Sequence, residues 1–417
     1  MPDADVIVVG AGPGGSATAA NLARRGLSVL LLEKATFPRD KICGDGLTPR
    51  AVRALTKLGV DITPANGFHR NDGLKVTGGG TTDLVMPWPD LTDFPNFGLT
   101  CSRMELDEKL ARHAQACGAT LVEGATVVAP ILGDDGRIAG VRTKAGEEYR
   151  APVVVAADGV SSRLGVAMGV QKLDTRPMGV AVRAYYRSPR GDDHYMESWL
   201  ELWDGEPGHS NVLPGYGWIF PLGNGVVNVG LGILSTSDAF GKTDYREMLR
   251  RWLAATPPEW ELTDENRIGQ IRGAALPMGF DRKPAYSRGL LLVGDAGGMV
   301  NPFNGEGIDY ALEAAEIAAD AIAEAHSRGI GTPAAERALA GYATHLTSAF
   351  GGYFRLGHVF ARLIGNPTIM RVCVKYGLPR RTLMQLVHKL LANLTDRRGG
   401  DWMDLSINTL TRIVPPA

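Results

Sequence analysis

The fold of this chain is decided near its start, by the stretch Asp5-Val6-Ile7-Val8-Val9-Gly10-Ala11-Gly12-Pro13-Gly14-Gly15. The unbroken apolar, β-branched run predicts a buried strand, and the alanine-rich segment from Ser16 to Arg25 predicts a helix. Strand, glycine turn and helix in this order indicate the first unit of a dinucleotide-binding fold.

Three glycines of this turn have separate expected tasks. Gly10 makes the tight turn, Gly12 lets the backbone come close to a pyrophosphate, and Gly15 lets the helix pack against the strand. The unpaired N–H groups and the positive end of the helix then face the anion. We therefore expect a pyrophosphate group at this turn.

An acid at the end of the next predicted strand supports this interpretation. The apolar segment 28–32 is followed by Glu33, where a dinucleotide-binding unit has a carboxylate that accepts a hydrogen bond from a ribose hydroxyl. A carboxylate here also argues against a 2′-phosphate at this site. A glycine-rich turn without a ligand is the alternative, and the agreement of strand, turn, helix and acid argues against it.

Composition excludes several classes of protein. With 417 residues, 44% of them hydrophobic, the chain is long enough for two domains or for one large α/β body with a second sheet. Lys and Arg number 44 and Asp and Glu 45, so no basic field recruits nucleic acid. The four cysteines and eight histidines lack paired or metal-ligand spacing, so we expect neither a disulfide framework nor a metal site.

The sequence also predicts a location in the cell. The first strand begins so close to the N-terminus that no signal peptide fits before it, and no apolar run reaches the ~18–20 residues that span a bilayer. Cysteines without a disulfide pattern fit a reducing compartment. We expect a cytoplasmic protein, with a peripheral position on the inner face of a membrane left open.

Two further apolar strands end in an acid. Residues 153–157 precede Asp158, and residues 289–293 precede Gly294 and Asp295. Ligands of open α/β sheets bind at the carboxyl ends of strands, which makes both acids candidate site residues. Asp158 has an equally good alternative as the cap of the helix that follows it.

The other elements expected in this part are helices at 49–58 and 103–117, the second capped by Ser102, and strands at 120–122 and 138–143 joined by a turn at 133–137.

The middle and the end of the chain have different patterns. Alternating residues and Gly/Pro turns predict antiparallel strands at 179–186, 198–202, 218–221 and 226–232, and a long alanine-rich helix at 308–325 is followed by a helical region broken at 365–367. We expect an α/β protein with a Rossmann-like domain, an inserted mixed or antiparallel β-sheet substrate domain and a helical C-terminal region. We expect the cofactor domain to comprise residues 1–60, 100–176 and 279–330. The substrate domain would comprise residues 61–99 and 177–278, and the helical C-terminal region residues 331–417.

Together these motifs resemble the FAD-dependent aromatic hydroxylase superfamily over about the first 330 residues. The resemblance rests on the residues already quoted and on Arg103, the Ala157-Asp158-Gly159 segment, and the Asn301-Pro302 and Gly305-Glu306-Gly307 segments. Residues 37–46, residues 216–221 and the Asn228-Val229-Gly230 segment resemble the geranylgeranyl reductase branch. Within it, Cys43-Gly44-Asp45-Gly46-Leu47-Thr48-Pro49-Arg50 is similar to the bacterial menaquinone reductases.

The resemblance implies FAD as cofactor, with NAD(P)H or another reductant as electron source. The residues themselves agree, because Asp295 can accept from a ribityl hydroxyl and the glycines after it bring N–H groups to the cofactor. Arg103 can pair with a phosphate, although a solvated surface arginine is the alternative. The expected cofactor-binding residues are Gly10, Gly12, Gly15, Glu33, Lys34, Cys43, Gly44, Arg103, Asp158, Asp295, Gly305, Gly307 and Ile308.

The reaction implied by the resemblance is saturation of a carbon–carbon double bond in a polyprenyl chain, either a menaquinone side chain or a geranylgeranyl group. The expected catalytic residues are Cys43, Tyr216 and Trp218. Cys43 could be a proton donor with a lowered pKa or a contact to the alkene, and a buried, inert cysteine is the alternative. The aromatic residues could line an apolar tunnel or form an ordinary sheet core; they are Trp88, Trp199, Trp203, Tyr216, Trp218 and Phe220.

Other functions are open on the same fold. A flavin monooxygenase or halogenase acting on an aromatic substrate would need a residue such as Lys75 to carry a reactive species. The Lys41-Ile42-Cys43-Gly44 segment belongs to the reductase pattern, which argues against it. A non-catalytic lipid-binding protein that keeps FAD for stability is a third alternative, which the complete set of flavin residues disfavours.

The C-terminal region contains a candidate contact with a membrane. Leu383, Leu386, Val387, Leu390, Leu391 and Leu394 share one face of a predicted helix with basic residues around it. Such a helix could lie in the lipid interface and admit a polyprenyl tail. It could equally pack on the cofactor domain.

Overall fold

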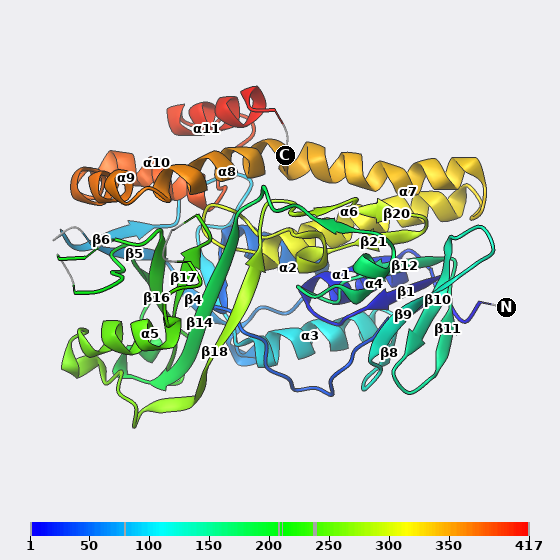
Figure 1. Cartoon of the computed structure of the whole chain (residues 1–417), viewed down its shortest axis with the longest axis horizontal. Coiled ribbons are helices and arrows are strands. Elements are labelled where there is room, and N and C mark those ends of the chain that lie inside the picture. The colour runs from blue at the N-terminus through cyan, green and yellow to red at the C-terminus, as the bar shows by residue number, and fades with distance from the viewer. Residues whose placement is uncertain (1, 79–80, 207–208, 211, 237–239, 416–417) are drawn as a thin grey trace.

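The protein is described here by a computed structural model that covers residues 2–78, 81–206, 209–210, 212–236 and 240–415. Figure 1 shows two large sheets side by side, with helices along one side of both. The expected α/β architecture is confirmed: a Rossmann-like unit, a second sheet domain and a helical C-terminal region.

The Rossmann-like unit is built on a six-stranded sheet in the order β20-β21-β12-β1-β2-β8. β1 (Val6–Val9) pairs in parallel with β2 (Val29–Leu32) on one side and with β12 (Val153–Ala156) on the other. β8 (Thr120–Val122) and β21 (Leu290–Leu292) extend the parallel part, and β20 (Tyr286–Ser287) is an antiparallel edge.

Both faces of this sheet are covered, which explains why its strands are apolar at every position. Val6 and Val8 face the helices α1 (Pro13–Arg24), α3 (Arg103–Ala116) and α6 (Ile308–Ser327), while Ile7 and Val9 face the three-stranded sheet of β9, β10 and β11. Helix α7 (Pro333–Leu346) lies over α6. The helices expected at 49–58, 103–117 and 308–325 are confirmed.

The three-stranded sheet corrects one expectation. β9 (Val127–Leu132) lies between β8 and β10 (Ile138–Thr143), so the turn at 133–137 joins β9 to β10 and does not follow β8. β11 (Glu148–Arg150) completes the sheet in the order β11-β10-β9. Pro130 interrupts the strand pattern of β9, and an edge strand tolerates a proline because one side of its backbone needs no partner.

The second domain is a seven-stranded sheet in the order β18-β14-β17-β16-β15-β5-β6. Its strands are β5 (Gly73–Gly78), β6 (Thr81–Pro87), β14 (Met178–Arg187), β15 (Tyr195–Trp199), β16 (Gly215–Pro221), β17 (Val226–Leu234) and β18 (Arg267–Pro277). All neighbours are antiparallel except β15 and β5, which run in parallel. The strand expected at 198–202 begins earlier, at Tyr195, and ends at Trp199.

Smaller elements connect the two sheets and cover the far side of the second one. β3 (Gly46–Leu47), β7 (Gly98–Thr100) and β4 (His69–Asn71) form a short sheet beside α2 (Pro49–Leu58). Helix α5 (Tyr245–Ala254) packs on the face of β14 and β17 that points away from the other domain.

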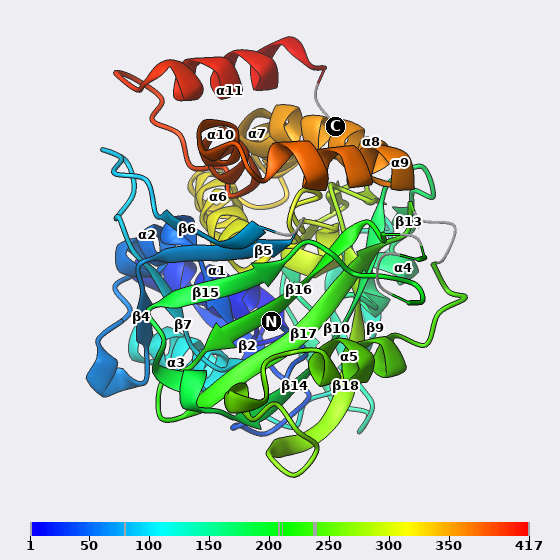
Figure 2. The ribbon, with the colours of Figure 1, turned by 90° about the vertical axis from the view of Figure 1, so that its left-hand side faces the viewer.

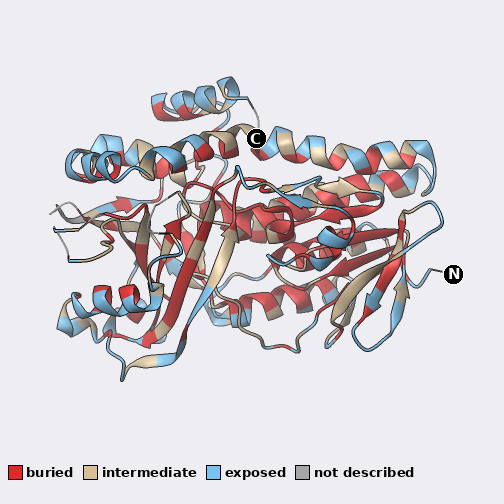
Figure 3. Cartoon of the chain, in the orientation of Figure 1, coloured by how far each residue is buried: buried red, intermediate tan, exposed pale blue. Residues whose placement is uncertain are grey.

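The C-terminal helices form a layer over the second sheet, as Figures 1 and 2 show from two directions. They are α8 (Gly352–Ile364), α9 (Pro367–Val372), α10 (Arg381–Leu391) and α11 (Trp402–Ile413). The break expected at 365–367 is confirmed, since α8 ends at Ile364 and α9 begins at Pro367. None of the described helices combines the length and the apolar character needed to cross a membrane. Figure 3 shows exposed residues on the outer sides of these helices and buried residues where the layers meet.

Candidate active site

One cavity of about 710 Å³ lies where the two sheets and the C-terminal helices meet. At one end it is lined by the glycine loops that follow the strands of the six-stranded sheet, including Gly12, Gly294 and Gly305. At the other end its lining is apolar and comes from β5, β16 and the C-terminal helices. A polar end and an apolar end in one cavity suit a charged cofactor and a lipid-like substrate.

The three glycines of the first turn differ in their surroundings. A side chain on Gly10 would lie 2.4 Å from the Ala157 carbonyl oxygen, and one on Gly15 would lie 1.8 Å from the Gly10 carbonyl oxygen. A Cβ on Gly12 would meet only the guanidinium groups of Arg103 and Arg39, at 3.8 and 3.9 Å. Gly10 and Gly15 are therefore required by packing, while Gly12 leaves open space beside two cations.

Arg103 and Arg39 are held in place by one buried acid. Asp107 accepts two hydrogen bonds from Arg103, from Nε and Nη2, both 2.7 Å, and one from Arg39 Nη1 at 2.7 Å. Burial by itself lowers the pKa of Arg103. The negative charge and hydrogen bonds of Asp107 have the larger effect, so the pKa of Arg103 is raised overall. Arg103 is buried, so the alternative of a solvated surface arginine is wrong. Both guanidinium groups lie beside Gly12 at the N-terminus of α1, a position that suits a pyrophosphate.

Glu33 lies at the end of β2 with little exposed surface. Its Oε2 accepts from the Ala11 backbone N–H at 2.8 Å and its Oε1 from the Ala35 N–H at 3.0 Å, and Arg39 Nη2 lies 3.4 Å from Oε2. The carboxylate is thus fixed beside the glycine turn, where a ribose would lie. Its neighbour Lys34 is exposed at the surface.

Asp295 follows β21 and lines the cavity. Burial opposes its charge, but Lys41 Nζ donates to Asp295 Oδ2 at 2.9 Å and Arg103 adds positive charge, so the pKa of Asp295 is lowered. Gly305, Gly307 and Ile308, at the N-terminus of α6, line the same part of the cavity. Together with the pyrophosphate cradle, this ionised acid and helix end fit the ribityl chain and ring edge of a flavin dinucleotide.

Asp158 is not brought into the cavity. The residues on either side of it, Ala157 and Gly159, belong to the lining, but the Asp158 carboxyl lies near the Ser162 hydroxyl and the backbone N–H of Leu164 at the start of α4 (Arg163–Ala167). This position favours its alternative role at the helix start.

Asp45 organises the loop that contains Cys43, and sequence reasoning assigned it no task. Its Oδ2 accepts from Tyr185 Oη at 2.7 Å and from Asn228 Nδ2 at 2.8 Å. Asn228 also donates to the Cys43 carbonyl oxygen at 2.8 Å and accepts from Trp218 Nε1 at 2.9 Å. Burial raises the pKa of Asp45 to about 6, against the hydrogen bonds from Tyr185 and Asn228. The only sequence signal for this network was the position of Asp45 and Asn228 in two family motifs.

Cys43 and Tyr216 line the cavity, but neither has the acidity expected of a proton donor. Burial raises the pKa of the Cys43 thiol, more than Arg103 and Lys41 lower it, so the expected lowered pKa is wrong. Burial also raises the pKa of Tyr216, whose hydroxyl donates to the Asn304 carbonyl oxygen at 2.7 Å. Both groups stay neutral, and the Tyr216 proton is already in use.

The apolar end of the cavity is built mainly on β16. Tyr216, Trp218 and Phe220 point into it from alternate positions of this strand, as their spacing predicted. Trp88 lines it as well. Trp199 does not line the cavity. It lies on the other face of the sheet, where it packs edge-on against Trp252 with 5.6 Å between the ring centroids. Trp203 also lies outside the lining. The opposite wall is formed by Phe360, Ile364, Met370, Cys373, Val374, Leu378, Leu383, Met384, Val387 and Leu391.

Helix α10 packs on the protein along one side, where Met384, His388 and Lys389 are buried. Leu394 has 0% exposure, and Leu390 and Leu391 pack against the core of the cofactor domain. Leu383, 41% exposed, is the one residue of the predicted apolar face that is well exposed. The end of this face, at Leu390, Leu391 and Leu394, is thus covered by other parts of the chain, and contact of the rest of the face with lipid stays a proposal.

Comparisons with known proteins agree with this geometry. A family model described as "FAD binding domain" matches residues 3–344. The menaquinone reductase of Mycobacterium tuberculosis is 37% identical over 401 residues, covering 96% of this chain and 93% of the relative. The digeranylgeranylglycerophospholipid reductase of Methanothrix thermoacetophila is 30% identical over 331 residues, covering 78% and 79%. A solved geranylgeranyl bacteriochlorophyll reductase-like protein from Thermoplasma acidophilum, 23% identical, has the same fold, with a TM-score of 0.74 and coverage of 97% and 95%.

Proposed function

Because the chain belongs to the FAD-dependent oxidoreductases of the geranylgeranyl and menaquinone reductase family, we propose that it saturates a carbon–carbon double bond in a polyprenyl chain, with the menaquinone side chain as first candidate. The observation that carries this proposal is the joined cavity, whose glycine-rich cofactor end continues directly into an apolar end lined by Trp218, Phe220 and Leu378. A polyprenyl tail is the kind of substrate that such an apolar end can bury.

The residues of this chain would bind, orient and shield the reactants. Gly12, Arg39 and Arg103 would hold the pyrophosphate, Glu33 the ribose and Asp295 the ribityl chain of FAD. Bound FAD, once reduced, supplies the hydride for such a reduction. The Asp45 network fixes the Cys43 loop and the Trp218 indole at the junction of the two ends. The apolar wall excludes water from the double bond.

The direct test is mass spectrometry of lipid quinones and other prenyl lipids from cells with and without the protein. A gain of two hydrogen atoms in the menaquinone tail identifies reaction and substrate together. The same gain in a geranylgeranyl lipid keeps the reaction and changes the substrate. No change in any prenyl lipid, with the purified reduced protein also inactive on menaquinone, contradicts the proposal.

A halogenase or monooxygenase function is less well supported. The residue that would have to carry a reactive species, Lys75, lies on β5 with its Nζ 3.8 Å from the buried Glu197 carboxylate. Its neighbours Leu74 and Val76 line the cavity, while Lys75 is not part of the lining. Successive side chains of a strand point to opposite faces, so Lys75 faces away from the cavity.

We also propose that the protein takes its substrate from an anionic membrane surface. The cavity reaches Cys373, Val374, Leu378 and Leu383 at the ends of the C-terminal helices. Next to these residues, Val372 and Tyr376 are 50% and 52% exposed. Exposed cations surround them, namely Arg371, Lys375, Arg380 and Arg381. Apolar side chains with a basic rim are typical of surfaces that lie on anionic lipid.

As the electron source we propose NAD(P)H or another reduced carrier. Support for an anionic donor comes from three neighbouring arginines, because burial lowers the pKa of Arg176 and the positive charges of Arg355 and Arg362 lower it further. Anaerobic addition of NADH, NADPH or a reduced ferredoxin, followed by the loss of oxidised-flavin absorbance, distinguishes these donors.

A further inference from the structure

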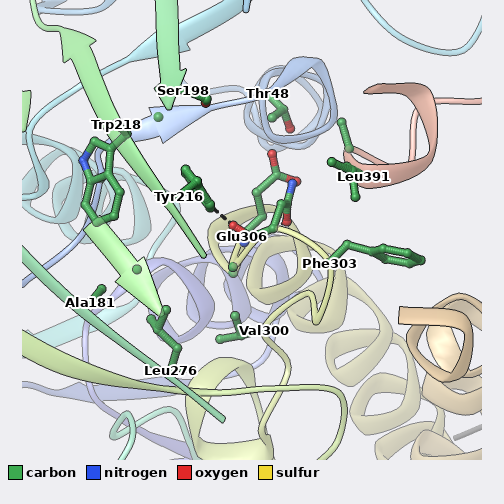
Figure 4. A pocket seen from close by; sticks show the side chains of 18 of the residues that line it. Thr48, Ala181, Ser198, Tyr216, Trp218, Leu276, Val300, Phe303, Glu306 and Leu391 are labelled. Atoms are coloured by element: carbon green, nitrogen blue, oxygen red, sulfur yellow. Dashed lines mark hydrogen bonds between the residues drawn. The ribbon is translucent and has the colours of Figure 1, made fainter. Parts of the chain in front are cut away.

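Glu306 is a half-buried acid in the wall of the cavity, with its Oε2 atom buried, for which sequence reasoning found no task. It lies in the loop before α6, between Gly305 and Gly307, and it lines the cavity together with Thr48 and Tyr216. Figure 4 shows its carboxyl group pointing towards Thr48 of the α2 start, near Leu391 at the end of α10. The carboxyl group therefore lies where the cofactor loop meets the apolar walls.

The loop fixes the backbone of Glu306 on both sides. The Glu306 N–H donates to Asn304 Oδ1 at 3.1 Å, and the Glu306 carbonyl oxygen accepts from the Asn301 N–H at 2.7 Å. Asn301 itself is anchored by Nδ2, which donates to the Leu391 carbonyl oxygen at 3.0 Å. The side chain is not anchored in this way, since Glu306 Oε2 is buried and makes no hydrogen bond to any described residue.

A buried line of acids and arginines leads from Glu306 towards solvent. Asp309, one turn into α6, has both carboxylate oxygens buried without a hydrogen bond among the described residues, and Arg50 Nε lies 3.9 Å from its Oδ2. Arg50 Nη2 donates to Glu313 Oε2 at 2.6 Å, and Glu313 also pairs at 2.8 Å with Arg53, which is partly exposed. Glu306 thus lies next to a group of charged residues along α6 that reaches the surface at Arg53.

The surroundings of Glu306 favour its neutral form. Burial and the nearby charge of Asp309 raise the pKa of Glu306 well above that of an ordinary glutamic acid, and burial raises the pKa of Asp309 as well. Arg50 opposes this shift without reversing it. The other ionisable groups that act on Glu306, or on which it acts, are Tyr216 of β16, Tyr310 of α6 and Tyr353 of α8.

We propose that Glu306 is the acid that gives a proton to the substrate double bond, an inference that rests on the proposed function. One alkene carbon takes the hydride from the reduced flavin, the other takes the Glu306 proton, and the π bond is lost. The flavin is left oxidised and Glu306 is left as a carboxylate. This carboxylate regains its proton from solvent, which completes the balance. A carboxylic acid gives up its proton more easily than a thiol or a phenol, and burial raises the pKa of Cys43 and of Tyr216 further.

The test compares wild type with Glu306→Gln, and uses Glu324→Gln, at an exposed position of α6, as control. For Glu306→Gln we expect unchanged FAD affinity and unchanged flavin reduction by dithionite, but at least a ten-fold slower reoxidation of the reduced flavin by a prenyl substrate under anaerobic conditions. The control variant should match wild type in all three. Equal reoxidation rates in wild type and Glu306→Gln overturn the proposal.

A second measurement needs neither activity nor cofactor. Infrared spectra of the apoprotein, prepared with isotope-labelled glutamate, report whether any glutamic acid is neutral near neutral pH. We expect a label-shifted band of a neutral carboxylic acid in wild type. The absence of that band overturns the proposal even if Glu306→Gln does not fold. Failure of the proposed function gives a different result. In that case the reduced flavin of the wild-type protein would reoxidise no faster with the prenyl substrate than without it.

Discussion

At the residue scale, Asp45 is the buried acid that ties the Cys43 loop to the second sheet. It has a positive φ of 64° and serves three elements at once: it accepts from Tyr185 and from Asn228, and its Oδ1 lies 3.3 Å from the backbone N–H of Arg103. An asparagine has nearly the same shape but cannot ionise. Asp45→Asn therefore separates the charge of this residue from its hydrogen bonds.

We expect Asp45→Asn to change how stability depends on pH. Burial raises the folded pKa of Asp45 to about 6, above the ordinary aspartic acid value of 3.8. For an acid shifted in this direction, the contribution to stability is complete below the unfolded pKa and is lost as the pH rises through the folded pKa. Between these values, wild type should lose stability relative to Asp45→Asn, by an amount on the order of 3 kcal/mol. Urea unfolding of both apoproteins across this pH range measures the difference, and parallel pH profiles would contradict the expectation.

Asp295 supports a second prediction at this scale. Removing its charge with Asp295→Asn should weaken FAD binding roughly ten- to hundred-fold, because a charge-assisted hydrogen bond to the cofactor is worth about 1.5–3 kcal/mol. Glu33→Gln should act in the same direction. Fluorescence titration of the apoproteins with FAD measures both. The matched control is Asp320→Asn, an exposed acid of α6, which should bind FAD as wild type does.

At the element scale, the first turn and helix α1 separate folding from cofactor binding. A Cβ on Gly15 would lie far inside contact distance of the Gly10 carbonyl oxygen, whereas a Cβ on Gly12 would touch no backbone atom. We expect Gly15→Ala to prevent or strongly destabilise folding. Gly12→Ala should fold with nearly the wild-type melting temperature but bind FAD at least ten-fold more weakly, because the methyl group fills the space of the pyrophosphate. A Gly12→Ala protein with wild-type FAD affinity would place the pyrophosphate elsewhere.

The C-terminal helices give a prediction about membrane binding. Because Leu390, Leu391 and Leu394 are covered, charges introduced on that side of α10 would test packing and not the membrane. The double variant Val372→Glu and Tyr376→Glu changes exposed positions beside the cavity instead. We expect it to bind anionic liposomes at least ten-fold more weakly and to keep its melting temperature and FAD content. Leu132→Glu, an exposed leucine on β9, is the control and should bind as wild type does. Equal liposome binding by the double variant would remove this surface from the proposal.

At the scale of the whole molecule, the joined cavity predicts chemistry without oxygen. A cofactor end that continues into an apolar end suits transfer of a hydride to carbon, which needs no dioxygen. The purified protein with dithionite-reduced FAD should therefore turn over a prenyl substrate anaerobically and form no hydroxylated or halogenated product. A product that requires oxygen would instead support the monooxygenase or halogenase alternative.

Much of the cofactor domain could be predicted from the sequence because its signals are local. The strand, turn and helix from Val6 to Arg24 are contiguous, and the tasks of Gly10 and Gly15 follow from the geometry of one turn. Covered strands are apolar throughout, so the strands before Asp158 and Asp295 could be located as well. The division into three sequence regions is compatible with the two sheets and stays a proposal.

The tertiary structure alone decided which distant residues meet. The parallel pairing of β5 with β15, the burial of Leu394 and the position of Trp199 on the far face all depend on what covers each surface, and an apolar face is the same in sequence whether protein or lipid covers it. Glu306 and Thr48 are separated by more than half of the chain, yet both line the cavity. Local patterns therefore determined the cofactor site of this protein, whereas its substrate cavity and buried acids depend on contacts between segments that no local pattern connects.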